Sequence, residues 1–402
     1  MGVKLDKFQQ DAIEELKNGC ILVGDTGSGK SRTALAYYYT KVCDGKLRIN
    51  CEGKTIPMKK PRDLYIITTA KKRDSKEWED ECIPFGLEFE KVNVVVDSWN
   101  NIKKYVNIYG AFFIFDEQRV VGWGEWSKAF IKITNKNQWI LLSATPGDTW
   151  TDYIPVFVAN RFYRNKTEFN AIHVVFDRNV KFPKVSRYIN EELLYEHRKE
   201  ILVNMKCERS TIPHYVTVHV EYDKELYNQV WVKRWNIYEN KPIEEVSRYY
   251  YLSRKVVNSD ISRIEEVRYL LTTTVPKAII FYNFDYELEA LKCMLNEEGI
   301  IFAEWNGKKH ESIPNNPMWA YLVQYNAGAE GWNCIETNTI IFYSQNYSYR
   351  IFKQATGRID RRNTKYRDLY YYILKSTAPI DLMIARALKQ KKNFNERDYY
   401  KS

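Results

Sequence analysis

The sequence lacks the features that mark secreted, zinc-binding and membrane-spanning proteins. Its seven cysteines are scattered, and no two of them have the Cys-x-x-Cys spacing of a zinc or redox site. Their number is odd, so a disulfide framework is not expected and a reducing compartment fits best. No stretch approaches the roughly 20 apolar residues of a membrane helix. The charged N-terminus also lacks the apolar run of a signal peptide. We therefore expect a soluble, cytoplasmic protein without a membrane partner.

What the sequence has in excess is positive charge. The 61 Lys and Arg residues outnumber the 51 Asp and Glu residues, which gives a formal net charge of +10. An excess of this size favours a polyanionic partner, although a generally basic protein without such a partner is the alternative. Hydrophobic residues make up 45% of the 402 residues, enough for two or three units with full cores. A disordered chain is thereby excluded.

Short apolar segments alternate with amphipathic helical stretches in the first half of the chain. Several of these segments are apolar on both faces, as buried parallel strands are. The alternation predicts an open parallel α/β sheet. The expected strands are Ile21–Gly24, Leu64–Thr68, Val92–Val96, Phe112–Phe115 and Trp139–Ser143.

The same pattern returns in the second half, so we predict two α/β lobes, 1–210 and 211–402, that join near Met205–Pro213. Between the two patterns, Thr211–Tyr222 is expected to form a strand, and the charged, aromatic segment of about 225–251 is expected to be a small helical insertion. The elements expected in the second half are the strands Lys277–Tyr282, Ala320–Gln324, Thr339–Tyr343 and Leu369–Ile373 and the helix Asp285–Glu297.

The strongest motif is a glycine-rich loop between a strand and a helix. It reads Gly24-Asp25-Thr26-Gly27-Ser28-Gly29-Lys30-Ser31, after the apolar CILVG and before the helix start SRTALAYYYT. Its glycines allow backbone N–H groups to surround phosphates at the positive end of a helix. Lys30 is expected to neutralise β/γ-phosphate charge, and Ser31 to ligate Mg²⁺. A chance glycine-rich turn is the alternative, but both flanks would then match by accident.

Two acids follow the apolar run Phe112–Phe115. We expect Asp116 to hold Mg²⁺ and Glu117 to orient and polarise the attacking water. An Asp-Glu pair alone is usually a solvated surface pair, but its place after a buried strand favours the catalytic interpretation. Upstream, Gln9 lies about fifteen residues before the loop, where its amide could read an adenine edge and select ATP. An exposed glutamine on an amphipathic helix is the alternative.

From Leu5 to about Ile373, the order of elements resembles superfamily 2 helicases and, within them, Swi/Snf-like translocases. In the first half, Gln9 matches the Q motif, Gly24–Ser31 motif I, Asp116-Glu117-Gln118-Arg119 motif II and Ser143-Ala144-Thr145-Pro146 motif III. In the second half, Lys277–Tyr282 resembles motif IV, Asn326-Ala-Gly328-Ala-Glu330-Gly331-Trp-Asn333 motif V and Gln354-Ala-Thr-Gly357-Arg358-Ile-Asp-Arg361 motif VI. The sequence departs from the Swi/Snf-like pattern in the Gln-Arg end of motif II, the Ser-Ala-Thr of motif III and the Arg362-Asn363 after motif VI.

The resemblance implies two tandem RecA-like lobes with ATP and Mg²⁺ bound in the cleft between them. Arg358 and Arg361 would act as arginine fingers, and we expect both on one helical face, three residues apart. Two further groups are implied: residues that couple the nucleotide site to lobe movement, and residues near the phosphates and the nucleic-acid backbone. The coupling residues are Ser143, Ala144, Thr145 and Gln354, and the backbone group is Gly328, Gly331 (also at ATP) and Asn333.

Further nucleic-acid contacts are expected at the carboxyl ends of two strands, where ligands bind in such sheets. Thr69, Lys71 and Lys72 follow one strand, and Ser98 and Trp99 follow another. Hydroxyls and lysines there would grip phosphate without reading sequence, and a solvated charged turn is the alternative. In the helical insertion, Trp231 and Trp235 could add contacts, but packing between helices is favoured; Trp99 and this insertion are the only wedge candidates.

These patterns predict a nucleic-acid-stimulated ATPase, a DNA helicase or translocase that binds single-stranded or duplex DNA without sequence specificity. The alternatives are an RNA helicase, a P-loop NTPase switch independent of nucleic acid, and a non-catalytic clamp. A replication or repair protein is the expected kind of partner. Richness in Lys, Asn, Ile and Tyr points to an AT-rich genome, and the compact length to a phage or mobile element, hence to a bacterial or phage-infected cell.

Overall fold

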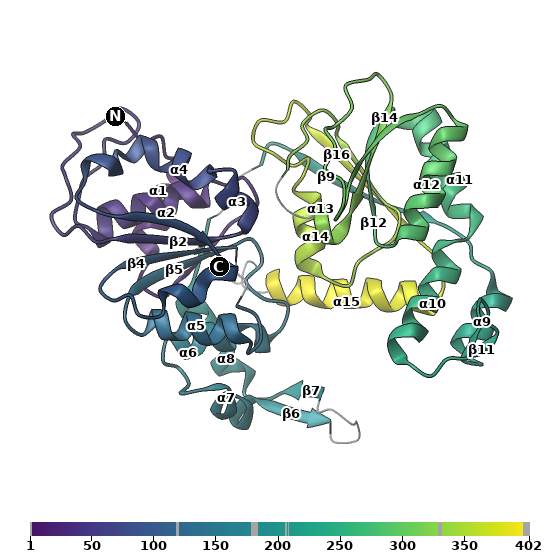
Figure 1. Ribbon diagram of the computed structural model, residues 1–402, viewed down its shortest axis with the longest axis horizontal. Helices are drawn as coiled ribbons and strands as arrows, with labels where there is room; N and C mark the ends of the chain where they lie inside the picture. The colour runs from purple at the N-terminus through teal and green to yellow at the C-terminus, as the bar shows by residue number, and fades with distance from the viewer. Residues whose placement is uncertain are drawn as a thin grey trace. The chain divides into compact units, whose positions relative to one another are not determined.

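The computed structural model describes residues 2–117, 120–177, 184–205, 207, 209–328 and 332–396. The chain forms two compact units. Unit 1 comprises Met1–Glu208 with Phe394–Ser402, and unit 2 comprises Arg209–Asn393. Each unit contains a six-stranded sheet with helices on both faces (Figure 1).

The sheet of unit 1 is parallel throughout, with the strand order β3-β2-β4-β5-β1-β8. Because every strand runs the same way, their carboxyl ends meet at one edge. Val23 pairs with Ser143 there, so the loop after β1 and the segment after β5 begin side by side. The strands are β1 (Ile21–Val23), β2 (Leu64–Thr68), β3 (Val94–Ser98), β4 (Phe112–Asp116), β5 (Gln138–Ser143) and β8 (Leu202–Asn204).

Alternate strand residues of unit 1 face two separate cores. Leu22, Ile114 and Leu142 belong to the core beneath the first helices of the chain, and Phe115 and Leu141 to the core on the opposite face. The helices over the first core are α1 (Lys7–Glu15), α2 (Lys30–Tyr37, continued by a π-helical turn, Tyr38–Val42) and α4 (Glu77–Cys82). Those over the second are η4 (Trp99–Tyr105), α5 (Glu125–Thr134), α6 (Ile154–Ala159) and α8 (Glu191–Ile201). α3 (Ala70–Asp74) lies at the carboxyl end of β2, and α7 (Lys166–His173) precedes β6.

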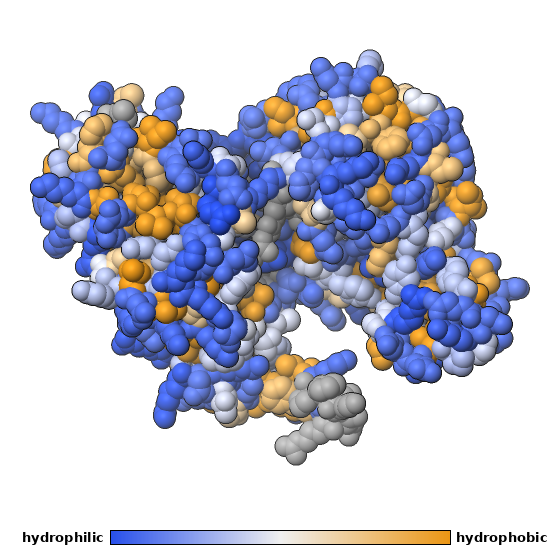
Figure 2. All heavy atoms as spheres, viewed as in Figure 1, coloured by the Kyte–Doolittle hydropathy of each residue, from blue (hydrophilic) through white to orange (hydrophobic). Residues whose placement is uncertain are grey.

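An antiparallel hairpin follows α7 and projects at the lower end of unit 1 in Figure 1. It consists of β6 (Val174–Asp177) and β7 (Lys184–Tyr188). The hairpin exposes Phe176 and Val185. Hydrophilic residues cover most of the face shown in Figure 2, and an apolar group is visible beside this hairpin.

Unit 2 repeats the architecture with the order β13-β14-β12-β15-β16-β9, again parallel. Its first strand, β9, lies at one edge and pairs with its last, β16, over eight residues. The strands are β9 (Ile212–His219), β12 (Lys277–Tyr282), β13 (Ile301–Trp305), β14 (Trp319–Gln324), β15 (Thr339–Phe342) and β16 (Asp368–Lys375). The helices are α9 (Lys224–Trp231), α10 (Val246–Asn258), α11 (Ile261–Tyr269, continued by a π-helical turn, Leu270–Thr274), α12 (Asp285–Glu297), α13 (Tyr325–Gly328), α14 (Tyr349–Thr356) and α15 (Pro379–Glu396).

The segment predicted as a helical insertion is helical only in part. Two short strands, β10 (Trp235–Asn236) and β11 (Lys241–Pro242), interrupt it between α9 and α10. Trp231 stacks on Tyr227 and Tyr249, with ring centroids 5.6 and 5.1 Å apart, so packing between helices is confirmed for this tryptophan.

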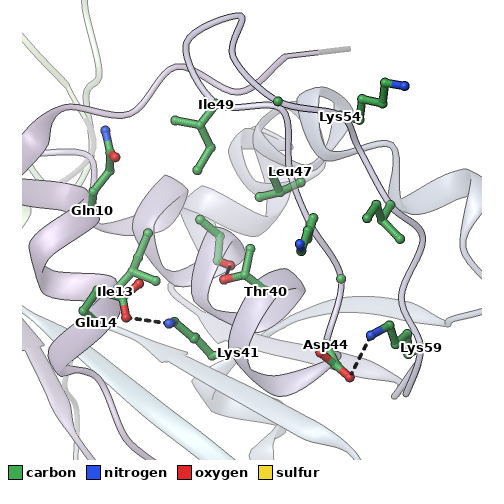
Figure 3. Close-up of a pocket in the computed structure, with 15 residues that line it drawn as sticks. Gln10, Ile13, Glu14, Thr40, Lys41, Asp44, Leu47, Ile49, Lys54 and Lys59 are labelled. Atoms are coloured by element: carbon green, nitrogen blue, oxygen red, sulfur yellow. Dashed lines mark hydrogen bonds and ion pairs between the residues drawn. The ribbon is translucent and has the colours of Figure 1, made fainter.

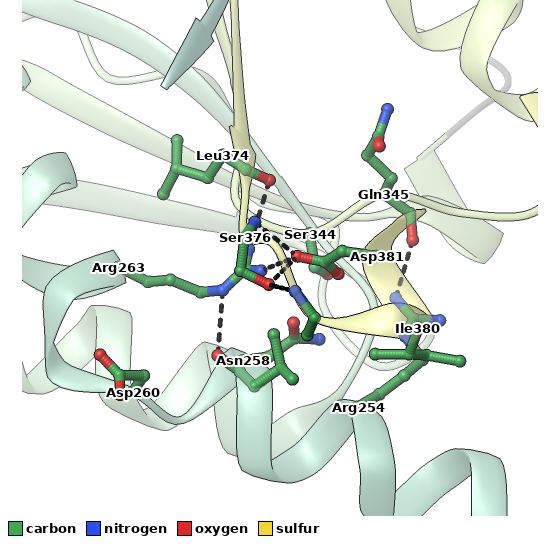
Figure 4. Close-up of polar contacts among 12 residues, drawn as sticks. Arg254, Asn258, Asp260, Arg263, Ser344, Gln345, Leu374, Ser376, Ile380 and Asp381 are labelled. Carbon is green, nitrogen blue, oxygen red and sulfur yellow. Dashed lines mark hydrogen bonds and ion pairs between the residues drawn. The ribbon is translucent and has the colours of Figure 1, made fainter. Parts of the chain in front are cut away.

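A buried ion pair joins the helices of unit 2 to its sheet (Figure 4). The side chain of Arg263 in α11 is 0% exposed, and its guanidinium lies 2.5 Å from an oxygen of Asp381 in α15. The same guanidinium donates to the carbonyls of Val257, Tyr343 and Leu374. One arginine thus fixes α10, α15 and the ends of β15 and β16 to one another.

The two parallel sheets with flanking helices confirm the predicted fold class, two tandem RecA-like lobes. Among the residues that the structure describes, none of the helices has the length and apolar character needed to cross a membrane.

Candidate functional site

The glycine-rich loop of unit 1 connects β1 to α2 at the carboxyl edge of the sheet. Gly27 and Gly29 have φ values of 76° and 81°, a region in which only glycine is unstrained. The Ser28 amide donates to the Asp25 carbonyl (3.1 Å), and the Gly24 amide donates to the Ser143 carbonyl of β5 (3.1 Å). The loop is therefore closed on itself and tied to the neighbouring strand at the N-terminus of α2.

Gln9 holds this loop from α1. Its side chain is buried, Nε2 donates to the Gly29 carbonyl (3.3 Å), and Oε1 accepts from the Asp6 amide (2.8 Å). A Cβ at Gly29 would lie 2.4 Å from Gln9 Nε2, so the close approach also requires glycine. The exposed-glutamine alternative is wrong, while adenine recognition by Gln9 stays a prediction.

Lys30 begins α2 and turns back over the loop. Its Nζ donates to the carbonyls of Gly24 (2.7 Å) and Asp25 (3.0 Å). Burial lowers the pKa of Lys30, and Glu117, Asp116 and Asp25 only partly oppose that shift. The ammonium thus lies on the concave side of the loop, where phosphate oxygens could replace the two carbonyls as acceptors.

The two acids follow β4, two strands away from the loop in the sheet. Asp116 is buried, and its Oδ2 accepts from Thr68 Oγ1 (2.8 Å), Lys72 Nζ (2.9 Å) and Trp78 Nε1 (3.0 Å). Burial by itself raises the pKa of Asp116, but Lys72 and the hydrogen bonds from Thr68 and Trp78 outweigh it and hold that pKa below its usual range. Asp116 is therefore ionised at neutral pH.

Glu117 has left-handed backbone geometry, with φ at 57°, which is uncommon for a residue with a Cβ. One of its carboxylate oxygens lies 3.5 Å from Lys72 Nζ. Such strained positions cluster at functional sites. The other two residues of the predicted motif II, Gln118 and Arg119, lie outside the described residues.

The structure places Lys72 in the acid pair, a role that the sequence did not suggest. Lys72 is in the first turn of α3, whose N-cap Thr69 accepts from the Lys72 amide (3.3 Å). Burial lowers the pKa of Lys72, but Asp116 and Glu117 raise it by more, so it stays charged. Its predicted contact with nucleic acid is not its contact here. Lys71, on the same helix, is exposed.

Two other predicted nucleic-acid contacts are corrected by burial. Trp99 is only 2% exposed, donates from Nε1 to the Asp116 carbonyl (2.9 Å), and stacks on Phe115. Ser98 is also buried, with Arg73 donating to its hydroxyl (3.3 Å). A ring in the core cannot stack on a base or act as a wedge, so Trp99 supports the acid strand instead.

The motif III segment adjoins the loop. Ser143 ends β5, its hydroxyl accepts from the Thr145 amide (3.1 Å), and its carbonyl accepts from the Gly24 amide. Ser143 and Thr145 are buried, and Ala144 between them is half-buried. A movement of this segment would therefore reach the phosphate loop through one backbone hydrogen bond.

In unit 2, the two motif VI arginines do not lie on one helical face, which corrects the prediction. α14 ends at Thr356, and Gly357 follows as its C-cap. Arg358 lies in the turn beyond, donates to the Trp332 carbonyl and lies over the Trp332 ring (5.6 Å). Arg358 and Arg361 are both largely buried. Glycine's low helix propensity explains the early end.

The remaining predicted residues of unit 2 are placed in part. Gln354 is buried in α14, and Gly328 ends α13. Gly331 lies outside the described residues. Asn333 lies in the segment before β15.

The donor set of unit 1 fits ATP with Mg²⁺. Asp116 and the Ser31 hydroxyl offer oxygen ligands, which Mg²⁺ prefers, and Mg²⁺ usually completes its shell with phosphates and water. Among the described residues, no group of three or more His, Cys, Asp or Glu could hold a metal ion without such help. At Gly24 a Cβ would lie 2.7 Å from Ser28 Oγ, so the loop backbone stays bare toward a ligand.

A separate cavity of about 710 Å³ lies between α1, the end of α2 and residues 44–59 (Figure 3). Its floor is apolar, with Ile13 and Leu47, and two ion pairs cross its rim, Lys41 with Glu14 and Lys59 with Asp44. None of the loop residues 24–31 and neither acid lines it, so it is distinct from the nucleotide site.

No protein-family model matches the chain. The Arabidopsis thaliana protein Photoperiod-Independent Early Flowering 1 is 23% identical over 155 residues, which are 36% of this chain and 8% of that protein. The chain thus spans less than a tenth of the length of this relative. The solved Sulfolobus solfataricus SWI2/SNF2 ATPase core in complex with dsDNA is 14% identical, with a TM-score of 0.44 over 98% of this chain and 93% of that chain. Similarities this low leave the function to be inferred from the site itself.

Proposed function

We propose that the protein is an ATP-dependent DNA translocase of the superfamily 2, Swi/Snf-like kind. The observation that carries the proposal is the pairing of a closed glycine-rich loop, with Lys30 turned over it, and an ionised Asp116 beside a strained Glu117. A phosphate cradle next to an acid pair, both at the carboxyl edge of one parallel sheet, is suited to nucleotide hydrolysis.

In this proposal each residue of unit 1 has a separate task. The loop amides and Lys30 bind the phosphates, and Ser31 with Asp116 would hold Mg²⁺. The bound ion would supply positive charge to the phosphates. Glu117 would orient the attacking water and accept its proton. Gln9 would contact adenine as an extension of its hold on Gly29.

We further propose that Arg358 and Arg361 of unit 2 complete the reaction when the two lobes close on ATP. An arginine finger of this kind raises turnover by about 10³–10⁵. Ser143, Thr145 and Gln354 would link the nucleotide state to that closure. The backbone bond between Gly24 and Ser143 supports the first part of this link.

DNA is the proposed track because the chain carries a net charge of +10 and exposes Lys71 at the edge where α3 begins. The sequence resemblance to DNA translocases favours DNA over RNA. A nucleotide switch that ignores nucleic acid is the alternative from a different class. A replication or repair protein as partner, and a phage origin, remain parts of the proposal.

The test is the ATPase rate of the full chain with single-stranded DNA, duplex DNA, RNA or no nucleic acid. We expect DNA to stimulate hydrolysis, Lys30→Ala to abolish it, and Glu117→Gln to bind ATP but hydrolyse it slowly. Lys132→Ala is the matched control, because Lys132 is an exposed lysine on α5. Stimulation by RNA alone would make the protein an RNA helicase, and no stimulation would make it a switch.

Unwinding is a separate activity that requires a wedge. Burial removes Trp99 from the wedge candidates, so translocation without strong unwinding is proposed. Triplex displacement on blunt duplex DNA and strand displacement on forked duplexes, each with and without ATP, separate the two activities. Robust ATP-dependent unwinding by the isolated chain would contradict this ranking.

A further inference from the structure

The acid pair of unit 1 already has a cation beside it. Lys72 Nζ lies 2.9 Å from Asp116 Oδ2 and 3.5 Å from Glu117 Oε1, so one ammonium serves both carboxylates. Asp116 Oδ2 also accepts from Thr68 and Trp78, which are both buried. The oxygen therefore has three donors, of which Lys72 is the only charged one.

This arrangement conflicts with the one that hydrolysis needs. A Mg²⁺ ion at Asp116 would lie within a few ångströms of the ammonium, and two cations at that distance in a site shielded from water repel strongly. Thr68 and Trp78 are neutral donors on packed elements and can stay. Lys72 is different, because its side chain is 25% exposed and extends from the five-residue helix α3 at the sheet edge. It can swing out at small cost.

We infer that Lys72 is an internal counter-ion of the nucleotide-free site, which must leave Asp116 before Mg²⁺ and ATP are held productively. We further infer that nucleic-acid phosphate receives the displaced ammonium. This inference rests on the proposed function and adds a regulatory step to it. Lys71 on the same short helix is exposed, so a phosphate backbone drawn to α3 would find Lys72 next to it. DNA would then stimulate hydrolysis by removing a competitor of the metal.

The first experiment measures how much Mg²⁺ the full chain needs to bind a fluorescent, non-hydrolysable ATP analogue. Without nucleic acid, Lys72→Met should lower the half-saturating Mg²⁺ concentration about ten-fold, the value of one charge-assisted hydrogen bond. Lys72→Arg, which keeps the charge, should behave like the wild type, as should the control Lys132→Ala. Duplex DNA should lower the Mg²⁺ requirement of the wild type but not that of Lys72→Met.

A second experiment uses the wild-type chain alone, in case the Lys72→Met chain folds poorly. Acylation of Lys72 by an amine-reactive reagent is followed by mass spectrometry, with Lys132 as the internal reference. Lys72 should react slowly in the nucleotide-free protein and several times faster with Mg²⁺ and the ATP analogue. Unchanged reactivity would overturn the inference.

Two further outcomes would also overturn it. An equal or higher Mg²⁺ requirement in Lys72→Met would show that the ammonium does not compete with the metal. Loss of nucleotide affinity at saturating Mg²⁺ would show that Lys72 is a phosphate ligand instead. A wild-type chain that binds no nucleotide at all would refute the proposed function itself, a result distinct from either of these.

Discussion

Replacing Asp381 by alanine should destabilise unit 2 selectively, because Asp381 compensates the buried charge of Arg263. The carboxylate accepts from the guanidinium at 2.5 Å and from the amide and hydroxyl of Ser376 at 2.8 and 2.9 Å. Alanine would leave a guanidinium with 0% exposure beside two orphaned donors. Breaking a buried pair by removing one partner costs about 3–5 kcal/mol, and we expect a loss in that range.

The assay is hydrogen exchange during urea titration, because two compact units need not unfold in one step. Exchange in β15, β16 and α15 should rise at lower urea, while exchange in β1, β4 and β5 should not change. Lys365→Ala is the control: Lys365 lies 3.5 Å from Glu336 with both side chains exposed, and such a pair contributes at most about 1 kcal/mol.

The double variant Arg263→Met with Asp381→Leu separates charge compensation from general packing. Replacement of both partners of a buried pair by apolar residues is often neutral. Most of the lost stability should therefore return. If Asp381→Ala costs no more than Lys365→Ala, or if the double variant is no better than the single one, the argument from uncompensated charge is refuted.

Three other predictions concern unit 1 and the proposed track. Burial lowers the pKa of His173, whose ring lies 2.7 Å from the Tyr163 hydroxyl, so the folded state prefers the neutral ring. Its stabilisation should be complete above about pH 6.5 and be lost as the pH falls through the folded pKa; urea midpoints between pH 8 and pH 5 should fall less in His173→Gln. Gly29→Ala should weaken binding of the ATP analogue, because φ is 81° and the new Cβ would lie 2.4 Å from Gln9 Nε2. Adding Gln9→Ala should restore only part of the affinity, since the backbone strain remains, and full restoration would assign the whole effect to the clash. DNA affinity should fall with salt by roughly 0.7–0.9 log units per log unit of salt for each phosphate neutralised, with little dependence on sequence; a flat response would contradict backbone tracking.

Long apolar runs made much of the fold predictable from the sequence. β2, β12 and α12 have the predicted bounds, because each is a buried segment of at least five residues with clear periodicity. β8 was missed because three residues after a helix carry no usable period. The hairpin β6–β7 was missed as well, since its second strand is almost wholly exposed and shows no alternation of apolar and polar residues.

The site was predictable where chemistry depends on neighbours in the sequence. The loop after β1 and the acids after β4 follow from short motifs in their flanking context. The contact between Lys72 and Asp116 spans 44 residues, and nothing local in a basic turn indicates an acid across the sheet edge. Trp99 was misassigned for a similar reason, because the sequence does not show which face of a strand end a tryptophan enters. Gly357 was a visible signal that the arginine segment leaves the helix.

Both sheets close by joining strands from opposite ends of their units. β1 of unit 1 pairs with β8, and β9 of unit 2 pairs with β16. A nascent chain must therefore hold β9 without its partner while more than a hundred further residues are added, at about 5–20 residues per second. During that interval β9 is an unpaired edge open to association with other chains. Truncation before Asp368 would make that exposure permanent, so a lower yield from shortened chains would reflect strand order more than lost contacts.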